Sequence, residues 1–338
     1  MPRTGQLAGL DLLHFRPHAG AHRVALRAGI CVFVPLLTVA LVGRPEWSMY
    51  AAFGAFTSLY GRNHVHLSRA AMQASAGAVL VGAVVLGVAV GTLPNAAWVA
   101  VPVAAAVAAL ASVLARAQDW HPPGSLFVVF AFGGCASVPH TSADLRPALL
   151  VSGLSALFAL AVGAVGGLAR GDRALPSRVR LHRSWLPLQD AVAAGVAGAL
   201  ATGSGIGHPY WATVAAVAPL SARGLRGQLA RGIQRVVGTL LGLGTSAVLL
   251  SLHLSGMALL AVIAALQVGA ELLVGRNYGV AMLVITPLAL LMGQAADEQP
   301  VGQLLFDRGV ETVIGSAVGL ALVLGLHLHR RRRGTARS

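Results

Sequence analysis

The chain has 338 residues, of which 56% are hydrophobic and only 11% carry a charge. A soluble domain of this size carries about 25% charged residues, so the composition excludes an ordinary soluble protein and predicts an all-α polytopic membrane protein. The formal net charge is +14, but the arginines stand between apolar segments, as in cytoplasmic loops. They form no separate basic domain, and we expect no nucleic-acid partner.

Glycine, proline and charged residues divide the chain into apolar segments that predict about twelve transmembrane helices. A helix needs about 20 residues to cross the hydrocarbon core, and the segments 47–60 and 209–222 are notably shorter. Either neighbouring loops continue these two helices, or the short segments mark a binding site. The predicted segments are 24–43, 47–60, 71–92, 97–115, 122–138, 147–168, 188–204, 209–222, 236–253, 257–274, 278–293 and 309–328.

An internal repeat relates the two halves of the chain. Arg-Pro-Glu-Trp at 44–47 is matched by His-Pro-Tyr-Trp at 208–211, and each is followed by an apolar stretch, a basic loop and Gln-x-x-x-Gly, at 73–77 and 234–238. With six segments in each half, the halves enter the membrane in the same orientation and predict two parallel six-helix repeats. Transporters commonly have this layout, with the substrate path between the repeats.

The segments and the repeat predict five regions along the chain. Residues 1–21 form a cytoplasmic N-terminal segment, and 22–168 form the first six-helix repeat. Residues 169–187 form an Arg-rich cytoplasmic connector, 188–328 form the second repeat, and 329–338 form a basic cytoplasmic tail.

The arginines predict how the chain lies in the membrane. With the N-terminus inside, only Arg44, Arg146 and Arg308 of the 25 basic residues fall on the outer side. By the positive-inside rule we expect a multi-pass protein of the bacterial plasma membrane with both termini in the cytoplasm.

Three acids enter or border the apolar segments and are candidates for proton coupling. Asp190 begins the second repeat, Glu271 lies one turn from Gln267, and Glu311 shares a helical face with Arg308. Charges at membrane depth usually mark a pathway or an internal pair. All three acids also lie near segment ends, where they could instead reach the interface.

Candidate substrate-binding residues gather at the repeated motifs. The guanidinium of Arg235 could bind a carboxylate through two hydrogen bonds, although an anchoring role at the membrane surface is the alternative. Aromatic residues at the repeated turns could stack on a substrate or anchor the protein at the interface. The predicted substrate-binding residues are Arg235, Gln234, Gln73, Trp47, Tyr210, Trp211 and Tyr278.

The sequence contains no motif for catalysis or for binding a cofactor or metal. It has no phosphate-binding loop, no nucleophile with a base, and no His/Cys cluster with metal spacing. We therefore expect no enzyme activity, no cofactor and no metal. The expected partners are the lipid bilayer and a small organic anion, with a homodimer also possible.

Read in order, several short motifs resemble the fusaric acid resistance (FUSC-type) family, which overlaps the aromatic acid exporters. The Gln-Arg-x-x-Gly-Thr segment is the most specific of them. In the first half they are Arg27, Trp47, Gln73-x-x-x-Gly77 and 121–124 (His-Pro-Pro-Gly); in the second they are 209–211 (Pro-Tyr-Trp), 234–239 (Gln-Arg-Val-Val-Gly-Thr), 276–279 (Arg-Asn-Tyr-Gly), 285–287 (Ile-Thr-Pro) and Arg308-x-x-Glu311-Thr312-x-x-Gly315.

The resemblance implies an inner-membrane protein of duplicated six-helix bundles that exports aromatic carboxylic acids at the expense of the proton gradient. This chain lacks the large soluble domain that many members carry between the halves, and it has Asp190 where a family-like arginine would stand. Two other functions stay open: a passive anion channel, and a non-transporting membrane scaffold for envelope assembly. The passive channel would need no pH gradient, and the scaffold would tolerate loss of the intramembrane acids.

Overall fold

The computed structural model describes residues 21–61, 66–168, 186–296 and 299–335, together with residues 12, 14, 15 and 17. Within these residues every regular element is helical. The first half contains α1 (Ala21–Leu41), α2 (Ser48–Ala55), α3 (His66–Gly91), α4 (Ala96–Ala117), α5 (Leu126–Ala136) and α6 (Leu145–Leu168). The second half contains α7 (Leu186–Gly203), α8 (Tyr210–Val217), α9 (Gly224–Ser251), α10 (Gly256–Val274), α11 (Tyr278–Ala296) and α12 (Val301–Thr335).

Eight of these helices are long and apolar enough to cross a bilayer: α1, α3, α4, α6, α9, α10, α11 and α12. Helices α2 and α8 have only eight residues each, and α5 has eleven. The prediction of an all-α polytopic protein is thus confirmed for the described residues. Twelve full crossings, and their division into two parallel repeats, stay predictions.

The two short predicted segments do not lengthen into their neighbouring loops. Helix α2 continues into the 3-10 helix η3 (Phe56–Leu59), and α8 is followed by the 3-10 helix η5 (Pro219–Ser221). Tyr60 and Ala222 then turn the chain to extended geometry. Gly61 and Gly224 follow with φ values of +72° and +71°, a left-handed conformation that glycine adopts without steric cost. Both halves therefore have a short interrupted helix at the same place.

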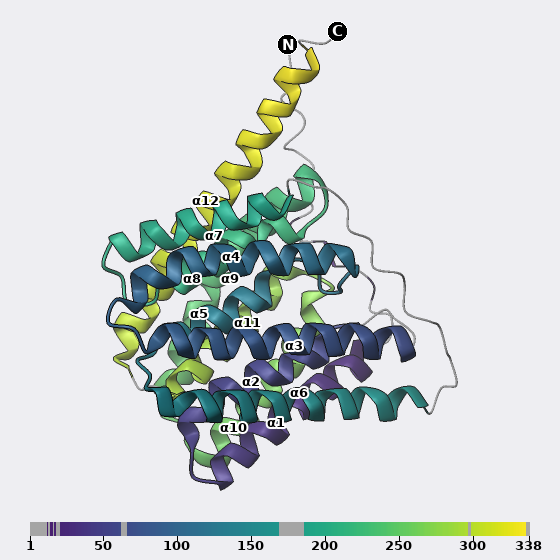
Figure 1. Ribbon diagram of the computed structural model, residues 1–338, viewed down its shortest axis with the longest axis vertical. Coiled ribbons are helices and arrows are strands. Elements are labelled where there is room, and N and C mark those ends of the chain that lie inside the picture. The colour runs from purple at the N-terminus through teal and green to yellow at the C-terminus, as the bar shows by residue number, and fades with distance from the viewer. Residues whose placement is uncertain are drawn as a thin grey trace.

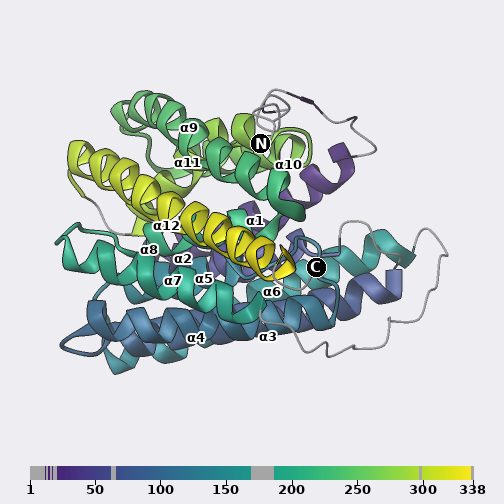
Figure 2. The ribbon, with the colours of Figure 1, turned by 90° about the horizontal axis from the view of Figure 1, so that it is seen from above.

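Helix packing in the first half recurs in the second. Figure 2 shows α9, α10 and α11 on one side of the molecule and α3 and α4 on the other, with the short helices α2, α5 and α8 between them. Two further contacts join the halves, α4 with α7 and α10 with α1, and these also correspond. The matching pairs are α1–α2 and α7–α8, α1–α6 and α7–α12, α2–α6 and α8–α12, α3–α5 and α9–α11, α3–α6 and α9–α12, and α4–α5 and α10–α11.

Glycines bring the short helices into backbone contact with long ones. A Cβ at Gly54 of α2 would overlap the carbonyl oxygen of Ser152 in α6. A Cβ at Gly315 of α12 would likewise overlap the carbonyl oxygen of Ala212 in α8. Small residues permit such approaches in lipid, where apolar side chains gain little by leaving hydrocarbon. These contacts fix α2 and α8 in the interior of the bundle.

The helix starts of α9 and α12 differ most from those predicted. Helix α9 begins at Gly224 rather than 236, and α12 begins at Val301 rather than 309. The arginines between the predicted segments indicate loops, but Arg231, Arg235 and Arg308 lie inside the helices α9 and α12. Arg308 in particular is buried in α12.

The predicted flanking regions are only partly visible. Helix α12 runs on to Thr335, past the predicted segment end at 328, and its C-terminal part projects from the bundle (Figure 1). Of the predicted connector 169–187, only the last two residues are described, and they open α7. Most of the predicted segment 1–21 also lies outside the described residues.

Candidate functional site

A cavity of about 260 Å³ lies between the two halves of the chain. The first half contributes η3, the loop before α5, and α5 itself, while the second contributes α8 to α12. Its volume is near the lower end for ligand pockets, which suits a small molecule. Three arginines, one glutamate and five aromatic side chains line it: Arg231, Arg235, Arg308, Glu271, Phe56, Phe127, Phe130, Trp211 and Tyr278.

Arg308 is the most deeply buried charge of this cavity. Its residue is only 1% exposed, and its guanidinium carbon lies 3.6 Å from the centre of the Trp211 ring. Its Nε and Nη1 are buried without a hydrogen-bond partner among the described residues. Buried N–H groups are normally paired, because leaving one unpaired costs about 1–3 kcal/mol. An oxyanion in the cavity would satisfy them.

Arg235 and Arg231 add two more guanidinium groups to the lining of the cavity. Arg235 is 3% exposed, and its Nη1 donates a hydrogen bond of 2.9 Å to the Tyr278 hydroxyl. The Arg235 Nε is buried without a hydrogen-bond partner among the described residues. The Arg231 guanidinium carbon lies 4.1 Å from the centre of the Tyr278 ring. One turn of α9 separates the two arginines, so both face α11.

Aromatic rings form one wall of the cavity, and Arg308 packs against this wall through Trp211. Phe56 and Phe127 meet edge to face with centroids 5.6 Å apart, and Phe130 lies 4.9 Å from Trp211. Pairs at these distances stabilise one another beyond simple burial. The wall joins a helix of the first half to one of the second, so a ring bound there would contact both halves.

Glu271 is the carboxylate that lines the cavity. It is buried on α10, one turn after the buried Gln267, and both side chains line the cavity. Glu271 and Gln267 share this cavity with Arg235. The charge state of Glu271 changes the net charge of a site that also holds three guanidinium groups.

Trp211 and Tyr278 also line the cavity, together with Arg235. Tyr210 lies behind it, because its ring stacks on Phe130 with centroids 6.3 Å apart and lines neighbouring pockets instead.

Three predicted binding residues have other contacts. Gln73 is buried in the first half, where its Nε2 donates to the Tyr60 carbonyl at 3.1 Å. The Gln234 Nε2 donates to the carbonyl oxygen of Leu12 at 2.9 Å. Trp47 ends the 3-10 helix η2 (Pro45–Trp47), with the Arg44 guanidinium carbon 5.4 Å from its ring centre. None of the three lines the cavity.

Asp190 joins helices rather than facing the cavity. Its carboxylate accepts hydrogen bonds from the hydroxyls of Ser112 at 2.9 Å and Ser125 at 3.0 Å. The Arg116 Nη2 lies 3.8 Å from it. Asp190 therefore ties α7 to α4 and to the start of α5.

Glu311 lies one turn after Arg308 on α12. Its Oε1 accepts a hydrogen bond of 2.8 Å from the backbone N–H of His208, and its Oε2 is buried without a hydrogen-bond partner among the described residues. The neighbouring Asp307 places Oδ2 3.5 Å from Nδ1 of His208. This acid-rich cluster packs behind Arg308 and does not line the cavity.

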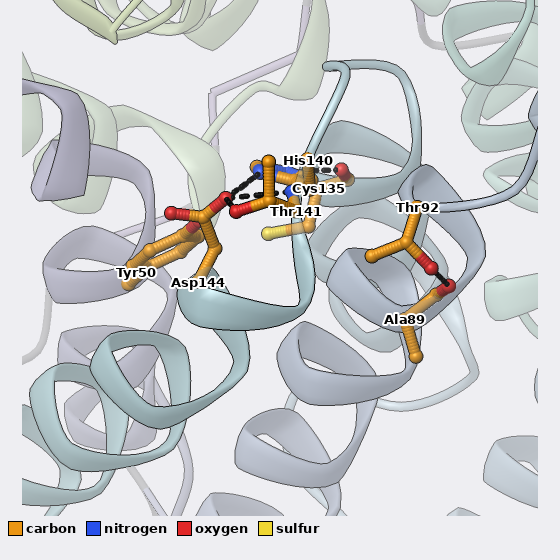
Figure 3. A network of polar contacts seen from close by, with 7 residues as sticks. All are labelled: Tyr50, Ala89, Thr92, Cys135, His140, Thr141 and Asp144. Carbon is orange, nitrogen blue, oxygen red and sulfur yellow. Dashed lines mark hydrogen bonds and ion pairs between the residues drawn. The ribbon is translucent and has the colours of Figure 1, made fainter.

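A second polar cluster lies at the loop between α5 and α6 (Figure 3). His140 Nε2 lies 2.9 Å from the Cys135 carbonyl oxygen, so this nitrogen carries the proton and donates it. Its Nδ1 then accepts from the Tyr50 hydroxyl at 3.4 Å. Asp144 accepts from the backbone N–H and hydroxyl of Thr141 at 2.8 and 3.0 Å. The burial of His140 lowers its pKa, consistent with a neutral ring.

Several residues of the cavity were missed from the sequence. The sequence gives Arg308 no binding role and places Arg231 in a basic loop. Phe127 and Phe130 lie in an apolar run without any polar marker. The Arg-x-x-x-Arg spacing at 231–235 was the available signal, since residues four apart share a helical face.

Comparison with known proteins places this cavity in a recognised segment. Residues 194–322 match the family model described as fusaric acid resistance protein-like. The resemblance predicted from the sequence motifs is confirmed over this segment. It contains every charged residue of the cavity, whereas Phe56, Phe127 and Phe130 lie outside it.

One curated relative is the "Uncharacterized membrane protein YvaC" of Bacillus subtilis (strain 168). It is 31% identical over 134 residues, which cover 39% of this chain and 21% of the relative. The aligned part thus spans about a fifth of that protein's length. No solved structure matches this chain. The composition, the helices and these matches support a multi-pass integral membrane protein whose residues 194–322 are similar to the fusaric acid resistance protein-like family.

Proposed function

We propose that this protein transports small aromatic carboxylates across the bacterial plasma membrane through the cavity between its halves. The observation that carries the proposal is the pair of buried guanidinium groups, Arg308 and Arg235, whose unpartnered N–H groups lie beside an aromatic wall. A carboxylate would accept hydrogen bonds from these N–H groups, and an aromatic ring attached to it would pack against the aromatic side chains.

Charge balance supports an anion as the substrate. Three arginines line the cavity, whereas Glu271 is the one carboxylate that lines it and Glu311 and Asp307 lie behind Arg308. The positive groups therefore outnumber the negative ones on the surface that a ligand would touch. Guanidinium is the group best shaped to hold a carboxylate there.

Coupling to protons rests on Glu271 in this proposal. A proton on Glu271 raises the net charge of the cavity by one, so substrate affinity should change with its protonation. Asp190 and Glu311 were predicted in the same role, but neither of them lines the cavity. We therefore place proton exchange at Glu271, with export driven by the proton gradient.

The two halves would form parallel repeats around this site. The corresponding helix contacts and the equal placement of the short helices α2 and α8 support that arrangement. The distribution of arginines supports cytoplasmic termini. A cavity at the boundary between repeats is where transporters of this layout bind their substrates.

Uptake into inside-out vesicles tests the proposal. Purified protein is reconstituted, and labelled benzoate is offered with and without an imposed pH gradient. We expect accumulation that needs the gradient and is absent from protein-free vesicles. The variant Arg226→Gln, an exposed arginine of α9 outside the cavity, is the matched control for Arg235→Gln.

The possible outcomes separate the competing functions. Gradient-dependent uptake that Arg235→Gln abolishes and Arg226→Gln preserves would support the exporter. Equilibration of benzoate without accumulation would replace it by a passive channel. Absence of any uptake of aromatic acids, in protein shown to be folded, would refute carboxylate transport and favour a scaffold.

A further inference from the structure

A second cavity, of about 330 Å³, lies between the ends of α4 and α7 and the helices α9 and α12. Arg116, Arg223 and Arg330 line it together with His327. No acidic residue lines it, and it shares no lining residue with the central cavity. It is therefore a separate, positively charged site.

The N-terminus of α9 opens into this cavity. Gly224 begins the helix with φ +71°, and both Gly224 and Leu225 line the cavity. Arg223 is the N-cap residue, and its side chain makes no capping hydrogen bond. The first N–H groups of a helix lack intrahelical acceptors and carry a partial positive charge, which together favour an anion.

The arginines of this cavity have only weak counter-charges. The closest approach of Arg116 to Asp190 is 3.8 Å, and that of Arg223 to Asp119 is 3.9 Å. The second pair is highly exposed on both sides, and such pairs contribute little.

A buried polar atom adds an independent sign of a ligand. The Nε2 of His327 is buried without a hydrogen-bond partner among the described residues. Since buried ring nitrogens are normally paired, a ligand oxygen would complete this one. Three guanidinium groups, a helix N-terminus and an imidazole match the oxygens of a phosphate group.

The surroundings of the cavity indicate that the phosphate belongs to a lipid. Leucine and valine side chains of α9 and α12 line the cavity beside the arginines. Next to it, Leu188 on α7 and Leu324 and Leu328 on α12 expose 55%, 42% and 56% of their surface. These leucines form the apolar surface that would face acyl chains, so an acyl chain could leave the cavity along α7 and α12.

We propose that this cavity binds the phosphate headgroup of an anionic phospholipid at the basic end of the helix bundle. The phosphate lies against the N-terminus of α9, between Arg223 and Arg330, and the acyl chains lie on the apolar faces of α7 and α12. The bound lipid joins α12 to the helices that surround it. This site is independent of the transport proposal, because its test measures lipid binding and not substrate movement.

Thermal unfolding of the purified full-length protein in neutral detergent tests this site. Short-chain phosphatidylglycerol, phosphatidylcholine of equal chain length and inorganic phosphate are titrated in parallel. We expect phosphatidylglycerol to raise the unfolding midpoint and the other two to leave it unchanged. In Arg223→Gln/Arg330→Gln the half-saturating concentration should rise about 25-fold, about fivefold for each arginine. Arg226→Gln, on the same helix but outside the cavity, should behave as wild type.

Each contrary result overturns a stated part of the proposal. If phosphatidylcholine raised the unfolding midpoint as much as phosphatidylglycerol, the anionic headgroup would not be what the site recognises. A phosphate effect equal to that of phosphatidylglycerol would assign the site to free phosphate and refute the lipid. An equal loss in Arg226→Gln would show general attraction to the surface. If the double variant does not fold, native mass spectrometry of the wild type decides, because the proposal requires retention of one phosphatidylglycerol in preference to phosphatidylcholine.

Discussion

Replacing Arg308 with glutamine should remove the preference of the central cavity for a carboxylate. The guanidinium is buried over Trp211 with two N–H groups unpartnered among the described residues. A hydrogen bond to a charged group contributes about 1.5–3 kcal/mol, which corresponds to about a 10- to 100-fold change in affinity. Arg308→Gln should therefore weaken benzoate binding about 10- to 100-fold.

Benzamide tests whether Arg308 recognises the charge or the shape of the ligand. It resembles benzoate but is uncharged, so its contact with the aromatic wall should be the same. We expect benzamide affinity in Arg308→Gln to stay within about threefold of wild type, because the lost interaction is specific to charge. Competition of both ligands against labelled benzoate, with purified protein in detergent, measures the two affinities.

A structural role for Arg308 would give a different pattern. Loss of folding would weaken benzoate and benzamide equally, and unchanged benzoate binding would refute the role assigned to Arg308. Arg308→Lys retains the charge but not the planar fork of the guanidinium. It should restore part of the preference for benzoate, which a purely steric explanation does not predict.

Other consequences follow from single contacts. Gly315→Ala should destabilise the protein by about 1–3 kcal/mol, because its Cβ overlaps a carbonyl of α8, while Gly325→Ala, with open space around it, should be neutral or stabilising in thermal unfolding. Asp190→Asn should lower the unfolding free energy by about 1–3 kcal/mol without changing the pH dependence of benzoate binding, whereas Glu271→Gln should abolish that dependence. Burial lowers the pKa of His140, so the unfolded chain takes up its proton first and stability falls as the pH drops below about 6.5; His140→Gln should reduce that loss in acid unfolding curves.

Much of the helical framework could be predicted because hydrophobic runs report burial in lipid or protein directly. Each predicted apolar segment contains a helix, and the short ones at 47–60 and 209–222 stayed short. The predicted starts of α9 and α12 were wrong for a physical reason: an arginine looks the same in sequence whether it lies in a loop in water or is buried within a helix. Arg308 shows the consequence, since only its packing over Trp211 reveals that it is buried.

The candidate site was predicted unevenly for a related reason. Trp211 and Arg235 meet in the cavity because the repeated motifs mark two of the helices that line it, whereas Tyr278 was predicted from a family-like motif and Glu271 as an acid in an apolar segment. Gln73 follows the same motif in the first half, but its side chain caps the end of η3 through the Tyr60 carbonyl. A repeat predicts equal backbone positions, whereas a binding role depends on side chains that the two copies do not share.

The contacts between the halves restrict how transport could proceed. Helix α4 packs on α7 and α10 packs on α1, so each half contributes a long helix to the other. Separating the halves as rigid bodies would break both of these contacts at once. Helices α5 and α8 meet through Phe130 and Trp211, whose centroids are 4.9 Å apart, and this aromatic contact forms part of the cavity wall. We therefore expect access to the cavity to change through movement of the short helices α5 and α8. Their aromatic contacts can rearrange while the long helices that join the two halves stay in place.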